Sequence, residues 1–193
     1  MPFQRGCMSV RVILTPHSDT PCAALTGIDV EITRLPEGGL ELHYFVMGRI
    51  RDVRWPAETV SQRLDRLWEH SCFEVFVSGA GRPGYYEFNL SPSTNWAAYR
   101  FSDYRAGMQM AVMASLPEIS SRITAKTHVL RATVPLINLH GLPEQAEWNI
   151  GLSAVIEQMD GTKSFWALAH PPGKPDFHHR DCFALQLTPP EAV

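Results

Sequence analysis

The 193-residue sequence has no excess of basic side chains, which argues against a nucleic-acid-binding surface. It contains 17 Lys and Arg against 20 Asp and Glu, which gives a formal net charge of −3 at pH 7. Proteins that bind nucleic acid usually concentrate Lys and Arg on one face of a basic domain. We therefore expect no nucleic-acid partner.

Long apolar runs are also missing. The apolar stretch near the start, residues 10–14, is interrupted by Arg11 and is too short for a secretion signal or a membrane span. Because the sequence shows no such segment and few cysteines, we expect a cytoplasmic protein with no membrane partner. Residues 1–8 show no structural pattern, so we expect them to be disordered or non-essential, and Met8 is a second candidate start.

Cysteine pairs and catalytic motifs are absent as well. Cys7, Cys22, Cys72 and Cys182 are far apart in the sequence, which favours free thiols over a disulfide framework. The sequence has no Gly-x-Ser-x-Gly, P-loop or His-Glu-x-x-His motif. We therefore expect a non-catalytic protein with no cofactor.

Strand patterns are what the sequence has in abundance. Residues 28–34 and 40–46 alternate apolar and polar side chains around a Pro-Glu-Gly-Gly turn, which predicts a hairpin. Further strands are predicted at residues 72–78, 85–91, 95–101, 122–127, 129–134, 148–157, 163–169 and 183–187. Short strands separated by turn residues predict an all-β fold, an antiparallel β-sandwich of about ten to eleven strands resembling a jelly roll, as one domain over residues 1–193.

Residues 57–69 break this pattern. Val60, Leu64 and Leu67 recur at three- and four-residue spacing with polar residues between them. The spacing is compatible with a short amphipathic helix. An ordered loop is the alternative, and the sequence does not decide between the two.

The central strands place polar side chains beside aromatic ones. If these strands are neighbours, one sheet face could gather Glu74, Glu87, Asn89, Arg100, Trp96 and Trp166. Carboxylates and a guanidinium can bind hydroxyls, and an indole can stack on the C–H face of a sugar. The alternative is an Arg–carboxylate pair on a solvated face, with both tryptophans in the core. A hydrolytic role for Glu74 and Glu87 is a further alternative.

The segment from His170 to Cys182 is rich in proline and histidine, so we expect a stiff loop between the last two strands. Its side chains include the metal-ligand types His170, His178, His179, Asp176, Asp181 and Cys182. Their spacing matches no zinc pattern, and we expect no metal site. The loop could instead form one wall of a ligand cleft, with His170 and Lys174 directed inward.

Three segments carry a family resemblance. Residues 67–76 (Leu-Trp-Glu-His-Ser-Cys-Phe-Glu-Val-Phe), residues 85–92 (Tyr-Tyr-Glu-Phe-Asn-Leu-Ser-Pro) and residues 164–178, which include His-Pro-Pro-Gly-Lys-Pro-Asp-Phe-His, resemble the DOMON-like superfamily and an uncharacterised bacterial branch of it. That superfamily includes the family-9 carbohydrate-binding modules. The resemblance implies a β-sandwich that binds sugars or haem. It also implies two tryptophan walls around a sugar, with Trp68 and Trp166 as candidates.

These inferences predict a domain that binds a small molecule, most plausibly a carbohydrate, as a monomer or weak homo-oligomer. The alternative is a haem- or metal-binding domain of the DOMON type, with Met108 or Met110 and His70 or His170 as axial ligands. The predicted ligand-binding residues are Trp68, Glu69, His70, Glu74, Glu87, Asn89, Trp96, Arg100, Trp166, His170 and Lys174.

Overall fold

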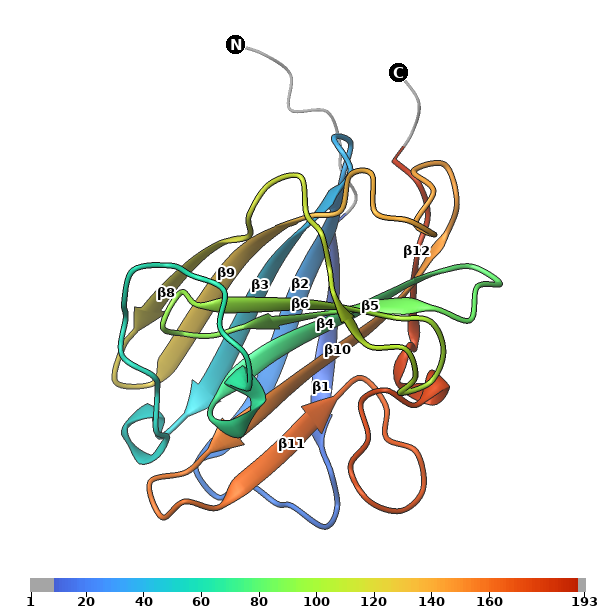
Figure 1. The fold of residues 1–193 in the computed structure, drawn as a ribbon. Coiled ribbons are helices and arrows are strands. Elements are labelled where there is room, and N and C mark those ends of the chain that lie inside the picture. The colour runs from blue at the N-terminus through green and yellow to red at the C-terminus, as the bar shows by residue number, and fades with distance from the viewer. Residues whose placement is uncertain (1–8, 191–193) are drawn as a thin grey trace.

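The computed structural model describes residues 9–190, in which twelve antiparallel strands form two layers around an apolar core (Figure 1). The strands are β1 (Ser9–Pro16), β2 (Leu25–Leu35), β3 (Gly39–Gly48), β4 (Cys72–Gly79), β5 (Tyr85–Leu90), β6 (Trp96–Phe101), β7 (Gln109–Met110), β8 (Glu118–Ile123), β9 (Thr127–Pro135), β10 (Trp148–Glu157), β11 (Lys163–Ala167) and β12 (Leu185–Leu187). Three short 3₁₀ helices lie in the connections: η1 (Ile50–Asp52), η2 (Leu67–Glu69) and η3 (Arg180–Cys182). The predicted antiparallel β-sandwich is confirmed.

β1 joins the two layers because its two ends pair with different strands. Residues 9–14 pair with β2, and Thr15 and Pro16 pair with β11. The first layer therefore has the order β1-β2-β3-β9-β8, and the second has the order β11-β10-β4-β5-β6-β7. β12 pairs with the start of β10, whose later residues pair with β11. The sheet is thus one continuous path that folds over on itself.

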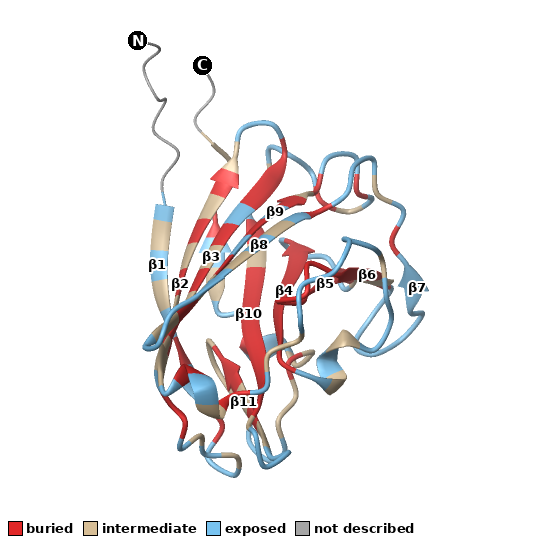
Figure 2. Cartoon of the chain, turned by 90° about the vertical axis from the view of Figure 1, so that its left-hand side faces the viewer, coloured by how far each residue is buried: buried red, intermediate tan, exposed pale blue. Residues whose placement is uncertain are grey.

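The two layers differ in how many of their faces are buried (Figure 2). In β2 the buried residues Ile28, Val30 and Ile32 alternate with partly exposed ones, as expected for a strand with one face toward solvent. All eight residues of β4 and all six of β5 are buried. These central strands must therefore be covered on the face that points away from the core as well.

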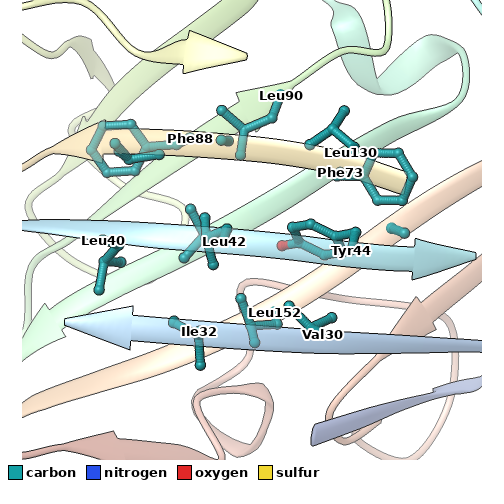
Figure 3. Close-up of a cluster of buried hydrophobic side chains, with 14 of the residues drawn as sticks. Val30, Ile32, Leu40, Leu42, Tyr44, Phe73, Phe88, Leu90, Leu130 and Leu152 are labelled. Carbon is teal, nitrogen blue, oxygen red and sulfur yellow. The ribbon is translucent and has the colours of Figure 1, made fainter. Parts of the chain in front are cut away.

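The core between the layers is built from the inward-facing side chains of both (Figure 3). Leu42 and Tyr44 of β3 face Phe73 of β4 and Phe88 of β5 in one buried cluster. The Tyr44 hydroxyl donates a 2.8 Å hydrogen bond to the backbone carbonyl of Glu74. This bond crosses the core and ties the first layer to the central strand of the second.

The structure resolves residues 57–66 as an ordered loop, so the alternative of an amphipathic helix is wrong. The loop lies along β6 and the turn before it: the Leu64 N–H donates to the Trp96 carbonyl at 3.0 Å, and the Trp96 N–H donates to Gln62 at 3.1 Å. Val60, which the helical spacing placed on an apolar face, is exposed. Sheet-like hydrogen bonds to β6 therefore override the spacing.

Several predicted boundaries change by a few residues, and β1 and β7 were not predicted. β1 has only one buried residue, Leu14, so its apolar alternation is weak.

Cys22, Cys72 and Cys182 are free thiols, in agreement with the prediction, whereas Cys7 and the expectation for residues 1–8 lie outside the described residues. Within residues 9–190, no helix has the length and apolarity needed to cross a membrane.

Replacing Tyr44 with Phe should lower the free energy of unfolding by about 1–2 kcal/mol, because a buried carbonyl loses its donor while the ring still fills the core. Urea unfolding followed by intrinsic fluorescence would measure the change. A difference below about 0.3 kcal/mol would show that the bond across the core contributes little to stability.

Candidate functional site

A cavity of about 380 Å³ lies on the second layer, on the face that points away from the core. Strands β4, β5, β6, β10 and β11 contribute its floor. The loop between β6 and β7, η2 and the cover loop (residues 168–184, between β11 and β12) contribute its walls. The lining side chains are Trp68, Glu74, Glu87, Tyr99, Phe101, Arg105, Met108, Val155, Phe165, Pro175, Phe177 and His178.

Strand alternation and register bring the floor residues together. On β4, Phe73 and Val75 enter the core, so Glu74 points to the opposite face. Glu74 pairs in register with Asn89 of β5 and with Ser153 of β10. Glu87, two residues before Asn89, is therefore a diagonal neighbour of Glu74, and such residues are roughly 7–8 Å apart, with their Cβ atoms somewhat closer.

Both carboxyl groups are buried, and each is held by one polar neighbour. Glu74 and Glu87 are only 3% and 6% exposed. Ser153 Oγ donates to Glu74 Oε2 at 3.1 Å, and Asn89 Nδ2 donates to Glu87 Oε1 at 2.7 Å. Burial, followed by the charge of Glu87, raises the pKa of Glu74 to about 8, and burial raises the pKa of Glu87 to about 6. Near neutral pH the pair therefore holds a proton that two exposed carboxylates would lose.

His178 faces the same carboxyls as a neutral imidazole. The Tyr85 hydroxyl accepts from the backbone N–H of Arg105 at 3.2 Å and lies 2.7 Å from His178 Nδ1. A hydroxyl oxygen can accept two hydrogen bonds, so the bond between Tyr85 and Nδ1 is compatible with either tautomer of His178; the other ring nitrogen, Nε2, lies 3.7 Å from Glu87 Oε2. Burial, with the charge of Arg105, lowers the pKa of His178 to about 4.

Asp176 anchors the cover loop above the cavity. Its carboxylate accepts from Arg105 Nη2 at 2.7 Å, from the Tyr104 hydroxyl and from the His178 N–H at 3.1 Å. The Cys182 thiol donates to the Asp176 carbonyl at 3.2 Å. These bonds fasten the cover loop to itself and to the loop between β6 and β7.

One glycine allows the cover loop to approach the sheet closely. A Cβ atom at Gly151 of β10 would lie 3.2 Å from the Cys182 carbonyl oxygen and 3.3 Å from Phe76 Cβ. The cover loop also packs His178 and Phe183 edge-on against Phe76. These contacts account for the burial of β4 and β5 on both faces.

Trp68 stands at the mouth of the cavity. It is 37% exposed, and its ring meets Tyr99 edge-on with centroids 6.0 Å apart. Tyr99 is held by a 2.7 Å hydrogen bond from its hydroxyl to Asp65. An exposed indole at the entrance, supported from behind, provides a flat surface for a ligand ring.

The expected gathering of all six polar and aromatic residues on one face is wrong for Arg100, Trp96 and Trp166. Trp96 and Trp166 pack in the core between the layers. Arg100 is in register with Tyr86, not with Glu87, and lies 3.2 Å from His140 Nδ1. Because alternation reverses the face at every residue, these three side chains leave β6 and β11 on the side opposite to Glu87.

The other predicted ligand-binding residues lie outside the cavity lining. Glu69 pairs with Arg66 at 2.5 Å, and His70 Nδ1 lies 2.8 Å from Glu157. His170 Nε2 donates to the Thr15 carbonyl at 2.8 Å, and Lys174 is exposed. The inward direction expected for His170 and Lys174 is therefore wrong. Asn89 is fully buried beneath the floor and reaches the site through Glu87.

Several lining residues were not predicted to belong to a binding site. Tyr99 and Phe101 share a face with Glu87 by alternation, and this signal was available in the sequence. Phe165, Phe177 and His178 also line the cavity, yet the tail gave no indication of which of its side chains turn inward. His178 was considered as a possible metal ligand or as part of a rigid loop, and not as a residue of the ligand site.

The structure does not support the haem or metal alternative. His70 and His170 are directed to Glu157 and Thr15, and Met110 is exposed on β7. Within residues 9–190, no group of three or more His, Cys, Asp or Glu side chains is arranged to hold a metal ion.

Comparison with known proteins shows similarity in fold. No family model matches the sequence, and no curated protein matches it. The chain is similar to a Bacteroides uniformis protein with a proposed carbohydrate-binding role, with a TM-score of 0.65, 16% identity and coverage of 91% of this chain and 84% of that one. It is also similar to a family-9 carbohydrate-binding module from Caldicellulosiruptor kristjanssonii in complex with cellotriose, with a TM-score of 0.50, 10% identity and coverage of 85% and 74%. The family-9 resemblance therefore holds for the fold.

Glu74 should make the free energy of unfolding depend on pH between about 6.5 and 8, because its pKa is raised to about 8. Because its pKa is raised in the folded state, protonated Glu74 stabilises the fold at low pH, and this contribution is lost as the pH rises toward about 8. The contributions of His178 and His128, whose pKa values are lowered to about 4, and of Glu87, whose pKa is about 6, change mostly below pH 6.5, so Glu74 makes the largest contribution to the change between pH 6.5 and 8. Between these pH values, we expect the wild-type free energy of unfolding to fall by about 1 kcal/mol or more.

The variant Glu74→Gln should show a flatter dependence in urea unfolding at the two pH values, whereas Glu118→Gln, an exposed substitution on β8, should behave as wild type. If the free energy of unfolding of Glu74→Gln changes between the two pH values as much as that of wild type, the assignment of this pH dependence to Glu74 is contradicted.

Proposed function

We propose that this protein binds a small carbohydrate, without cleaving it, in the cavity beneath the cover loop. The observation that carries the proposal is the combination of two buried carboxyl groups on the floor with aromatic walls in one partly enclosed space. Sugar hydroxyls donate hydrogen bonds to carboxylates, and the apolar C–H face of a sugar ring packs on aromatic rings. A volume of about 380 Å³ is in the range of small-molecule sites.

Two further features support binding over catalysis. Glu74 and Glu87 are buried side by side on adjacent strands of the cavity floor, whereas a glycosidase pair flanks the scissile bond from two sides. Ser153 and Asn89 each occupy one carboxyl oxygen of the pair, which fixes the orientation of the acceptors. The similarity in fold to a carbohydrate-binding module, a class of non-catalytic proteins, agrees with this role.

Isothermal titration against a panel of mono- and oligosaccharides tests the proposal. For a sugar that binds, Trp68→Ala should weaken the affinity at least about tenfold, because the stacking surface at the mouth is lost. Leu64→Ala is the matched control, since Leu64 is similarly exposed (39%) on the preceding loop and does not line the cavity. Absence of binding across the panel would contradict the proposal, and release of a shorter sugar would contradict its non-catalytic part.

The anchor of the cover loop provides a second test. Asp176→Asn should weaken sugar binding several-fold, because the loop loses its ion pair with Arg105 and becomes less ordered above the cavity. Hydrogen exchange should be faster in residues 174–179 of this variant. Asp181→Asn, an exposed change in the same loop, serves as the control. Equal affinity in wild type and Asp176→Asn would show that the cover loop does not shape the site.

A further inference from the structure

The ionisable lining of the cavity is acidic. Four lining residues belong to types that can carry a charge near neutral pH: Glu74, Glu87, Arg105 and His178. Arg105 is already paired with Asp176 at 2.7 Å, and His178 is neutral near pH 7. Among residues 9–190, no Lys or Arg nitrogen forms an ion pair with Glu74 or Glu87. Near neutral pH the two carboxyl groups hold one proton between them, so the pair carries one negative charge that no free cation in the lining balances.

Each carboxyl also keeps one oxygen without a hydrogen-bond donor. In the described part of the chain, Ser153 uses Oε2 of Glu74 and leaves Oε1, and Asn89 uses Oε1 of Glu87 and leaves Oε2. The Nε2 atom of His178 is 3.7 Å from Glu87 Oε2, which is too far for a hydrogen bond. Both side chains are more than nine-tenths buried and line the cavity. Neither oxygen is an enclosed atom without a partner, so both are open to the cavity, where water or a ligand that displaces it can supply the donors.

Much of the lining beside these acceptors is aromatic. Five lining residues carry aromatic rings, three on the strands of the floor and two on the walls: Tyr99, Phe101, Phe165, Trp68 and Phe177. The faces of aromatic rings attract cations, and an acidic floor with aromatic walls is the arrangement that recognises ammonium groups. A neutral hydroxyl could donate to the same oxygens, but it would leave the charge of the pair uncompensated.

We infer that the preferred ligand is a sugar with a free, protonated amine, whose ammonium group lies between Glu74 and Glu87. The inference rests on the proposed carbohydrate function and names the class of sugar. An ammonium group has three N–H donors and can take the place of the proton that the pair holds near neutral pH: that proton leaves to solvent, and the ammonium donates to the free oxygen of each carboxyl. Acetylation of the amine removes the charge and should remove the preference.

The test compares three matched sugars by isothermal titration at pH 7 and fixed ionic strength: D-glucosamine, N-acetyl-D-glucosamine and D-glucose. We expect wild-type protein to bind glucosamine at least about tenfold more tightly than the other two. In Glu74→Gln and in Glu87→Gln, this preference should fall below about threefold. Glu41→Gln, an exposed change on the first layer, should retain it. Urea unfolding of each variant verifies that it is folded. If only one of Glu74→Gln and Glu87→Gln folds, the comparison with wild type is made with that variant.

The outcomes separate this inference from the proposed function. Equal or tighter binding of glucose or N-acetylglucosamine would overturn the preference for an amine and leave a carbohydrate-binding protein. A preference that persists in both cavity variants would place the ammonium group elsewhere and overturn the assignment to Glu74 and Glu87. Failure of all three sugars and of the wider oligosaccharide panel would overturn the proposed function, and this inference with it.

Discussion

The structure depends on a strand that is buried on both faces and has a carboxyl group near its middle. The backbone of β4 at Glu74 is held from one side by Tyr44, whose hydroxyl crosses the core. The side chain of Glu74 leaves the opposite face and meets Ser153. Burying a carboxyl is unfavourable unless it is protonated or hydrogen-bonded, so the surroundings of Glu74 must supply both a donor and a means of holding the proton. The second layer meets this requirement: Ser153 supplies the donor, and burial raises the pKa of Glu74 so that it keeps its proton.

The cover loop converts a polar sheet face into a cavity. Asp176 and Arg105 join the cover loop to the β6–β7 loop, while His178 and Phe183 pack on Phe76. The prolines of the cover loop lower the entropic cost of ordering it, since their backbone is already restricted in the unfolded chain. The cavity is thus formed by segments from η2, from the β6–β7 loop and from the end of the chain, and its shape depends on a few polar contacts between them.

Much of the fold could be predicted from the sequence, because alternation has a direct physical cause. Ile28, Val30 and Ile32 are buried where the period-two pattern puts them, and β10 has the predicted bounds. The pattern failed where few side chains are buried or where backbone hydrogen bonds decide the conformation. β1 has little buried surface, and residues 57–66 owe their shape to backbone bonds with β6 that no side-chain pattern reports.

The candidate site was only partly predictable for the same reason. Glu74 and Glu87 were correctly placed on one face, since each alternates with core residues on its own strand. Trp96 and Trp166 were assigned to that face by residue type, although strand alternation sends both into the core. The inward direction of Phe177 and His178 depends on the anchor at Asp176, a contact between segments about 70 residues apart.

The central claim is that ligand binding occurs on the outer face of the second layer and not in the sandwich core. Of the tryptophans at positions 55, 68, 96, 148 and 166, only Trp68 lines the cavity. Indole N–H resonances recorded during titration with a bound sugar test this claim directly. The account predicts a large shift for Trp68 and little change for Trp96, Trp148 and Trp166. A stationary Trp68 resonance together with shifts of Trp96 or Trp166 would contradict it.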